Sequence, residues 1–170
     1  IAEMRFLRAH WYFNLKIMWK YVPYIDENVN SNDYGNISNR ELTNDQLWEK
    51  IATDLQFAVD NLPASQTQIG RPSKIAAQAY LAKTKLYQAY EQDEQHNVTK
   101  INADKLNQVV TLCDAVIASS YSLEPDFANN FINGSYENGR ESIFAVQFSK
   151  DDGTMFGRLN YGDVLSAPQG

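Results

Sequence analysis

Three tyrosines and two asparagines in polar, turn-rich stretches are the side chains best suited to bind a ligand. Tyr34 and Tyr136 each precede an asparagine by two residues, Asn36 and Asn138, and Tyr161 lies in a glycine-containing stretch near the end of the chain. A tyrosine ring offers an apolar face and a hydroxyl group, and an asparagine amide both donates and accepts hydrogen bonds. Together such groups suit a ligand with apolar ring faces and hydroxyl groups, so these five residues are the predicted ligand-binding set.

The residue spacing does not predict a catalytic or metal centre. The two histidines, His10 and His96, stand apart from each other and from the single cysteine, Cys113, and no His-Glu-x-x-His or Gly-x-Ser-x-Gly pattern occurs. Asp151 to Gly153 lack the alternating acids and distal glutamate of a calcium loop, which favours a turn. We expect no catalytic residue, metal or cofactor. A pair of glycosidase carboxylates stays an alternative, because their spacing is spatial.

The charge of the chain argues against a nucleic-acid partner. Its 170 residues carry a formal net charge of −6, whereas nucleic-acid-binding surfaces are basic. The same charge argues against simple adsorption on anionic lipid. No apolar run approaches the roughly 18 residues that a membrane-spanning helix needs. Because the chain opens at Ile1 already in a helical pattern, we expect an excerpt of a longer protein.

Four amphipathic helices are expected to position the polar loops. Apolar residues that recur at three- and four-residue steps predict helices over about 1–19, 43–62, 73–91 and 102–119. Thr43 followed by Gln46 is a capping-box pattern, and Ser73 is placed to cap the third helix. The predicted apolar face of the first helix holds Met4, Leu7, Trp11, Leu15 and Met18, and that of the third holds Ala76, Ala79, Tyr80, Lys83, Leu86, Tyr87 and Tyr90.

The remaining segments are predicted mainly as loops. Residues 24–42 are rich in asparagine and read as a long loop, and residues 92–100 form a polar connector. Residues 126–133 indicate a short helical turn. From Ser142 to Ser149 apolar and polar residues alternate, which predicts a strand.

The helix starts suggest a repeating architecture. They fall near residues 43, 73 and 101, at intervals of 30 and 28 residues. Helix pairs at this pitch favour a tetratricopeptide-like array, although Trp48, Ile51 and Leu55 match the repeat pattern only loosely. The predicted fold class is therefore mainly α, an α-α superhelical scaffold with a short strand near the C-terminal end.

Four phrases in a fixed order carry the strongest signal in the sequence. They are Arg5–Ala9, Val22–Glu27, Gly70–Ala77 and Glu141–Phe148. In this order and at these separations they resemble the SusD/RagB family of nutrient-capturing lipoproteins of Gram-negative outer membranes. The resemblance covers nearly all of residues 1–150.

The resemblance implies a non-catalytic binding protein. The complete protein would be held in the outer membrane by a lipidated cysteine absent from this chain. Facing outward, it would cap a TonB-dependent, SusC-like transporter and present an oligo- or polysaccharide, or a peptide, to it. Residues 1–125 would be the helical scaffold with tetratricopeptide-like helix pairs. Residues 126–170 would be a loop-rich segment with one strand (142–149), the start of a missing C-terminal half.

Two other functions stay open from the residues alone. One is a helical-repeat scaffold that binds another protein and no small ligand, which an apolar groove between helices would favour. The other is a hydrolase, which two facing carboxylates in a cleft would favour.

Overall fold

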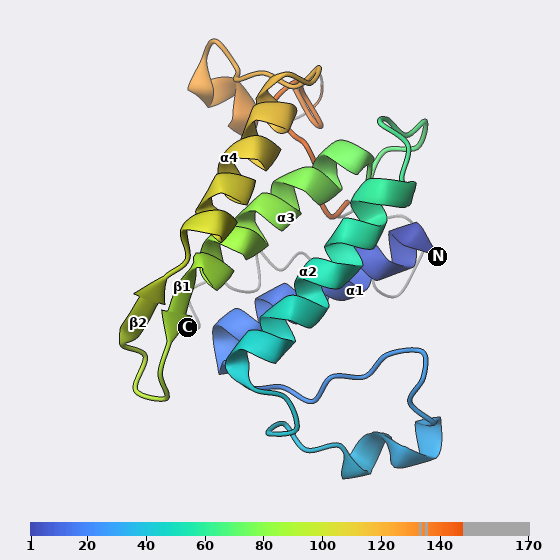
Figure 1. Ribbon diagram of the computed structural model, residues 1–170. Coiled ribbons are helices and arrows are strands. Elements are labelled where there is room, and N and C mark those ends of the chain that lie inside the picture. Colours follow the sequence, from blue (N-terminus) through green and yellow to red (C-terminus); the bar gives the residue numbers. More distant parts are fainter. Residues whose placement is uncertain (133, 135, 148–170) are drawn as a thin grey trace, which may run out of the picture.

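The computed structural model describes residues 1–132, 134 and 136–147, and all four predicted helices are present in it (Figure 1). They are α1 (Ala2–Trp19), α2 (Asn44–Asn61), α3 (Lys74–Ala89) and α4 (Ala103–Ile117). Two 3-10 helices, η1 (Ser31–Asn36) and η2 (Phe127–Phe131), lie in the loops. Strands β1 (Tyr90–Gln92) and β2 (Val98–Ile101) form an antiparallel hairpin. The mainly α fold is confirmed.

Side-chain caps fix where three of the helices begin. The Thr43 hydroxyl accepts a hydrogen bond from the Gln46 N–H (3.2 Å), and the Gln46 amide oxygen accepts one from the Thr43 N–H (2.9 Å). The predicted capping box at α2 is thus confirmed. Ser73 caps α3 through the Ala76 N–H, and Asn102 caps α4 through the Lys105 N–H. Because each cap satisfies N–H groups that lack an intrahelical partner, the helix starts are set locally.

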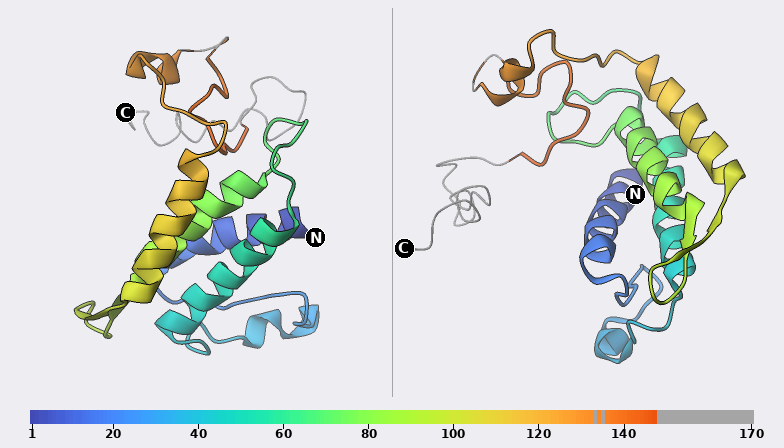
Figure 2. Two further views of the ribbon diagram at one scale, coloured as in Figure 1. Left: turned by 45° about the horizontal axis from the view of Figure 1, so that its top comes forward. Right: turned by 90° about the vertical axis from the view of Figure 1, so that its left-hand side faces the viewer.

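Consecutive helices pack side by side. Helix α2 packs against α1 and α3, and α4 packs against the other side of α3. Figure 2 shows the result as a curved stack, with α1 on the inside and α4 on the outside. The core lies between α1, α2 and α3 and is built from large apolar side chains, including Phe6, Phe13, Ile51, Leu55 and Leu81. The arrangement is the tetratricopeptide-like α-α stack that the helix spacing predicts.

Two predicted helix faces are wrong in part. In α1 the buried residues are Phe6, Ala9, Phe13 and Lys16, whereas Met4, Trp11 and Met18 are 68%, 59% and 68% exposed. The apolar residues of α1 cover two sides of the helix, and the sequence does not say which side meets α2. In α3 the small residues are buried, because α2 and α4 both approach closely. The larger side chains of Leu86, Tyr87 and Tyr90 are more than a third exposed.

The predicted strand over 142–149 is wrong for its described part. Residues 142–147 form no strand, and 148–149 lie outside the described residues. A strand requires a neighbouring strand to satisfy its backbone groups, and none lies here among the described residues. Both Ile143 and Phe144 instead pack on the helical core. The hairpin that does form, β1 with β2, lies in the region predicted as a polar connector. The division at residue 125 stays a prediction.

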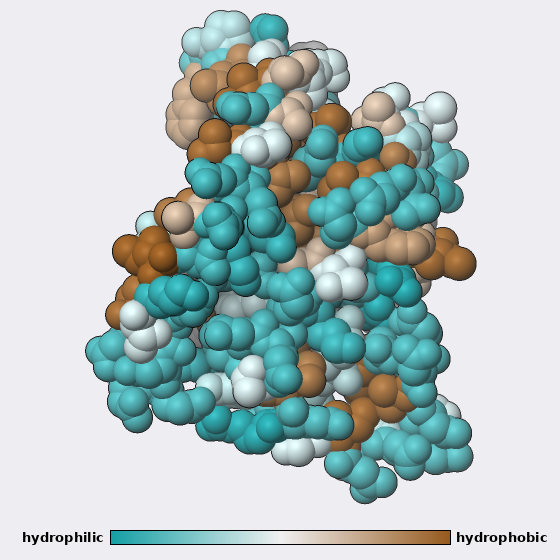
Figure 3. All heavy atoms as spheres, in the orientation of Figure 1, coloured by the Kyte–Doolittle hydropathy of each residue, from teal (hydrophilic) through white to brown (hydrophobic). Residues whose placement is uncertain are grey.

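The end of the molecule beyond α4 is rich in exposed apolar side chains. Leu123, Phe127 and Phe131 are 78%, 71% and 74% exposed. On the face drawn in Figure 3, hydrophobic atoms gather at this upper end, while hydrophilic side chains cover most of the lower half. The segment that follows α4 therefore exposes apolar surface, as does one side of α1.

Candidate functional site

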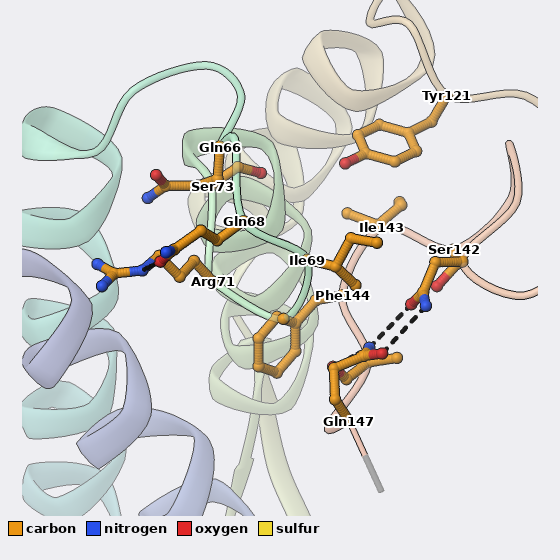
Figure 4. A pocket seen from close by; sticks show the side chains of 13 residues that line it. Gln66, Gln68, Ile69, Arg71, Ser73, Tyr121, Ser142, Ile143, Phe144 and Gln147 are labelled. Carbon is orange, nitrogen blue, oxygen red and sulfur yellow. Dashed lines mark hydrogen bonds between the residues drawn. The ribbon is translucent and has the colours of Figure 1, made fainter. Parts of the chain in front are cut away.

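Two adjoining cavities lie where the loop before α3 meets residues 121–147. One has a volume of about 170 Å³ and the other about 380 Å³. They share Asn138, Ser142, Ala145 and Gln147, and we call them together the double pocket. In Figure 4 the side chains of Gln68 and Arg71 lie on the loop side of the smaller cavity, while Ser142 and Gln147 lie on the other.

The loop wall is fixed to the first turn of α1. Arg71 donates through Nη1 to both carboxylate oxygens of Glu3 (3.0 and 2.9 Å), and Gln66 Nε2 donates to Glu3 (3.2 Å) and to the Pro72 carbonyl (3.0 Å). The Lys74 N–H donates to the Pro63 carbonyl (2.8 Å), which closes the loop at its base. Since Glu3 pairs with Arg71, this wall presents little net charge to the cavity.

Gly70 allows the two walls to meet. Its φ is +87°, a backbone conformation that side chains with a Cβ rarely adopt. A Cβ at this position would lie 2.7 Å from Cγ of Gln147, closer than real Cβ atoms come to another atom. The glycine of the third family phrase is therefore required twice, for the turn and for the close approach of Gln147.

The second wall is organised by Glu141. Its carboxylate accepts hydrogen bonds from the Glu124 N–H (3.0 Å) and from Asn130 Nδ2 (2.9 Å), and these bonds lower the pKa of Glu141. Arg140 Nε donates to the Ser122 hydroxyl (2.7 Å). Phe144 anchors the following segment, with its ring 4.9 Å from that of Phe6. The fourth family phrase thus folds the loop and attaches it to the core.

Amide side chains dominate the polar surface of the double pocket. Asn138 Nδ2 donates to Gln147 Oε1 (3.0 Å) and Gln147 Nε2 donates to Asn138 Oδ1 (2.8 Å), the pair of dashed lines in Figure 4. Asn138 sits at φ 53°, a conformation that asparagine tolerates better than most residues. Amides both donate and accept, as sugar hydroxyl groups do. Further amides and aromatic rings line the two cavities: Gln66, Gln68, Asn130, Tyr121, Phe131 and Tyr136.

The predicted ligand residues separate into two groups. Tyr136 and Asn138 line the double pocket. Tyr34 and Asn36 are exposed on η1, at the opposite end of the molecule in both Figure 1 and Figure 2. Tyr161 lies outside the described residues. The structure brings the second Tyr-x-Asn pair to a cavity and leaves the first on an exposed turn.

Sequence reasoning missed most of the double pocket. Gln66 and Gln68 carry no motif of their own, and Gln147 falls within the predicted strand. The available signal was their position: Gln147 lies within Glu141–Phe148, and Gln66 and Gln68 lie four and two residues before Gly70–Ala77.

The carboxylates of Asp54 and Glu27 lie close together, but they hold the scaffold and do not form a catalytic acid pair. Arg8 donates to both oxygens of buried Asp54 (2.6 and 2.7 Å) and also to Glu27, which Arg5 contacts at 2.7 Å. The hydrogen bond from Arg8 lowers the pKa of Glu27 to about 2. A glycosidase acid needs a raised pKa. This cluster joins α1, the Val22–Glu27 phrase and α2.

Neither a metal-binding cluster nor a membrane-spanning helix is present within the described ranges. No group of three or more His, Cys, Asp or Glu side chains is placed to hold a metal ion there. None of the helices in the same ranges combines the length and the hydropathy needed to cross a membrane.

Comparison with known proteins identifies the family. The sequence profile of a SusD-like family, described as starch-binding and associating with the outer membrane, matches residues 2–86, half of the chain. The chain belongs to the SusD-like family. The resemblance carried by the four phrases is thereby confirmed.

Related SusD-like proteins include glycan binders. SusD-like protein P2 of Formosa agariphila is 30% identical over 148 residues, which cover 86% of this chain and 27% of that protein. A laminarin-binding SusD-like protein superposes with a TM-score of 0.68 at 28% identity, over 87% of this chain and 30% of that one. Surface glycan-binding protein A of Bacteroides thetaiotaomicron, in complex with laminarihexaose, superposes with a TM-score of 0.65 at 25% identity, over 87% of this chain and 28% of that one.

Family membership settles the broad class. SusD-like proteins are non-catalytic glycan-binding proteins, which agrees with the prediction of no enzyme, and the family description includes association with the outer membrane. The chain spans 27% to 30% of the length of the three relatives.

Proposed function

We propose that this SusD-like chain supplies part of a glycan-binding surface in a non-catalytic outer-membrane uptake system. The observation that carries the proposal is the double pocket, where amide and aromatic side chains converge from the loop before α3 and from the segment after α4. Its amides match the mixed donor and acceptor character of sugar hydroxyl groups. Its exposed rings, Phe131 and Tyr136, offer apolar faces to sugar rings.

A neutral glycan suits this pocket best. Arg71, which lines the smaller cavity, is held by Glu3, and Asn138 and Gln147 at the shared floor are uncharged. Two relatives carry a β-glucan, laminarin or laminarihexaose, in their descriptions. Laminarin is therefore the first ligand to test, and a peptide is the alternative.

The proposed cellular setting rests on the family and not on the geometry. We propose that the complete protein is lipid-anchored, faces outward and works with a TonB-dependent, SusC-like transporter that receives the glycan. The support is the family description, which includes association with the outer membrane.

A scaffold without a small ligand is the second candidate. One observation favours it: Met4, Trp11 and Met18 form an exposed apolar stripe on α1. Exposed apolar stripes commonly pack against another protein surface.

Affinity electrophoresis tests the proposed function. The full-length protein is run in native gels containing laminarin, xyloglucan or starch, and each polysaccharide is analysed for products after incubation. We expect retardation by at least one polysaccharide without cleavage. Cleavage would contradict the non-catalytic role. Free migration in all the gels would contradict glycan binding and favour the scaffold without a small ligand.

A further inference from the structure

A third cavity, which shares no lining residue with the double pocket, carries positive charge. It has a volume of about 180 Å³ and lies where the C-terminal end of α1, the N-terminal end of α2 and the β1–β2 hairpin meet. We call it the basic pocket. It is lined by Lys16, Ile17, Lys20, Asn44, Trp48, Tyr87, Tyr90, Gln92 and His96. Figure 1 shows the hairpin beside these two helix ends.

Lys16 is a buried ammonium group without a carboxylate partner. The residue is 3% exposed. Its Nζ donates to the Lys20 carbonyl (3.0 Å) and to Asn44 Oδ1 (2.8 Å), and lies 4.8 Å from the centre of the Trp48 ring. It forms no ion pair among the described residues. Burial of an unpaired charge is unfavourable, and it lowers the pKa of Lys16 to about 8.

Lys20 adds a second unpaired ammonium. Its Nζ donates to the Asp93 carbonyl (3.1 Å) and lies 3.2 Å from His96 Nδ1. The Asp93 carboxylate is occupied by the backbone N–H groups of Gln95 and Asn97, and Glu94 binds Tyr21 and Arg40. These neighbouring acids therefore give Lys20 no ion pair within the residues that the structure describes.

Aromatic rings border the two lysines. Trp48 and Tyr87 are tilted against each other with their centres 5.2 Å apart. Tyr87 and Tyr90 line the basic pocket and are 43% and 40% exposed. A ligand that enters thus meets ring surface as well as ammonium groups, which suits a ring that has an apolar face and an anionic group.

We propose that the basic pocket binds the carboxylate of an acidic sugar, the uronate residue of a glycan. Lys16 and Lys20 supply the counter-charges, Asn44 and Gln92 bind hydroxyl groups, and Tyr87 and Tyr90 contact the ring. This site is separate from the double pocket and selects for charge, whereas the double pocket is suited to neutral sugar.

The test compares an acidic oligosaccharide with its uncharged form. Binding of tetragalacturonate and of its methyl ester to the full-length protein is measured by isothermal titration calorimetry. We expect the acid to bind at least about tenfold more tightly than the ester. Lys20→Gln should weaken binding of the acid by a similar factor, since it removes a charged hydrogen-bond donor. Lys16→Met tests whether the buried lysine contributes to binding of the acid. Lys85→Gln, on α3 outside the cavity, is the matched control for Lys20→Gln.

Every other pattern overturns the proposal. Equal affinity for acid and ester, no binding of either, or an unchanged affinity in folded Lys20→Gln would each do so. If tetraglutamate bound as tightly as tetragalacturonate, the ligand of the basic pocket would be an acidic peptide and not an acidic sugar. An Asn138→Ala, Gln147→Ala double variant should retain tetragalacturonate affinity, so failure of the neutral-glycan function and failure of this site are distinguishable.

Discussion

Gly70 and Gln147 show how one backbone position shapes the double pocket. The left-handed turn at Gly70 brings the loop before α3 within contact of the Gln147 side chain, which pairs with Asn138. A substitution at Gly70 therefore acts on the pocket without removing any of its polar groups.

Gly70→Ala should lower the free energy of unfolding by about 1–2 kcal/mol, because a residue with a Cβ is strained at this φ. It should also weaken glycan binding, since the Gln147 side chain must move. Urea unfolding and calorimetry with the retained polysaccharide check both effects. The control is Gly35→Ala, whose Cβ would meet nothing within 4 Å. A Gly70 variant as stable as this control would contradict the turn argument.

Lys16 should make stability depend on pH at alkaline values. The pKa in the folded state is about 8, below its ordinary 10.5. Between these values the unfolded chain binds more protons, so the free energy of unfolding rises with pH. The rise is on the order of 3 kcal/mol. Urea unfolding from pH 7.5 to 10.5 should show it in the native protein and not in Lys16→Met; parallel curves would contradict the assignment.

Asp54 connects α1, the loop that follows it and α2, which are far apart in the sequence. It accepts hydrogen bonds from Arg8 on α1 and from the Tyr24 hydroxyl (3.1 Å) in the following loop, while itself belonging to α2. The first two family phrases thus meet at one buried carboxylate, and this explains why arginine and tyrosine occupy these positions.

Asp54→Ala should lower the free energy of unfolding by about 2–3 kcal/mol, because it removes the buried acceptor of Arg8 and Tyr24 and leaves the partly buried Arg8 only Glu27 as a counter-charge. Asp60→Ala, an exposed acid on the same helix, should change it by less than about 0.5 kcal/mol. Chemical denaturation of the two variants side by side provides the comparison. Equal stabilities would mean that the cluster does not hold α1 to α2.

Elements set by local chemistry were predictable, and pairings across the chain were not. Thr43, Gln46 and Ser73 mark where helices start because they form hydrogen bonds within three residues along the chain. The alternation after Ser142 also looked local, but a strand depends on a partner, and here Phe144 packs on Phe6 instead. The Asn138–Gln147 pair and the contact between Gly70 and Gln147 join loops that only the folded helices bring together. The spacing of residues in the sequence therefore could not predict these parts of the candidate site.

At the scale of the whole molecule, charge separates the two proposed sites. The chain has a net charge of −6, and the shared floor of the double pocket is uncharged. The exposed apolar side chains of α1 also show that a helical stripe predicts a covered face without showing which surface covers it. The matched region covers only 27% to 30% of the three relatives.

Binding of a neutral polysaccharide should change less than about twofold between 50 and 500 mM salt, because screening acts on charges and not on amide hydrogen bonds. Repeated calorimetry over this range measures it. Single-stranded DNA serves as a polyanion for comparison and should not bind. A steep loss of polysaccharide affinity with salt would point to the lysines and against the double pocket.

The most direct test of the account locates the neutral-glycan site. Calorimetry with the polysaccharide that retards the native protein compares the Asn138→Ala, Gln147→Ala double variant with a Tyr34→Ala, Asn36→Ala double variant, both in the full-length protein and both checked for folding. We predict that the first variant loses at least tenfold in affinity, roughly the effect of 1.4 kcal/mol, while the second binds as the native protein does. The reverse result would place the site at η1 and contradict the assignment of the double pocket.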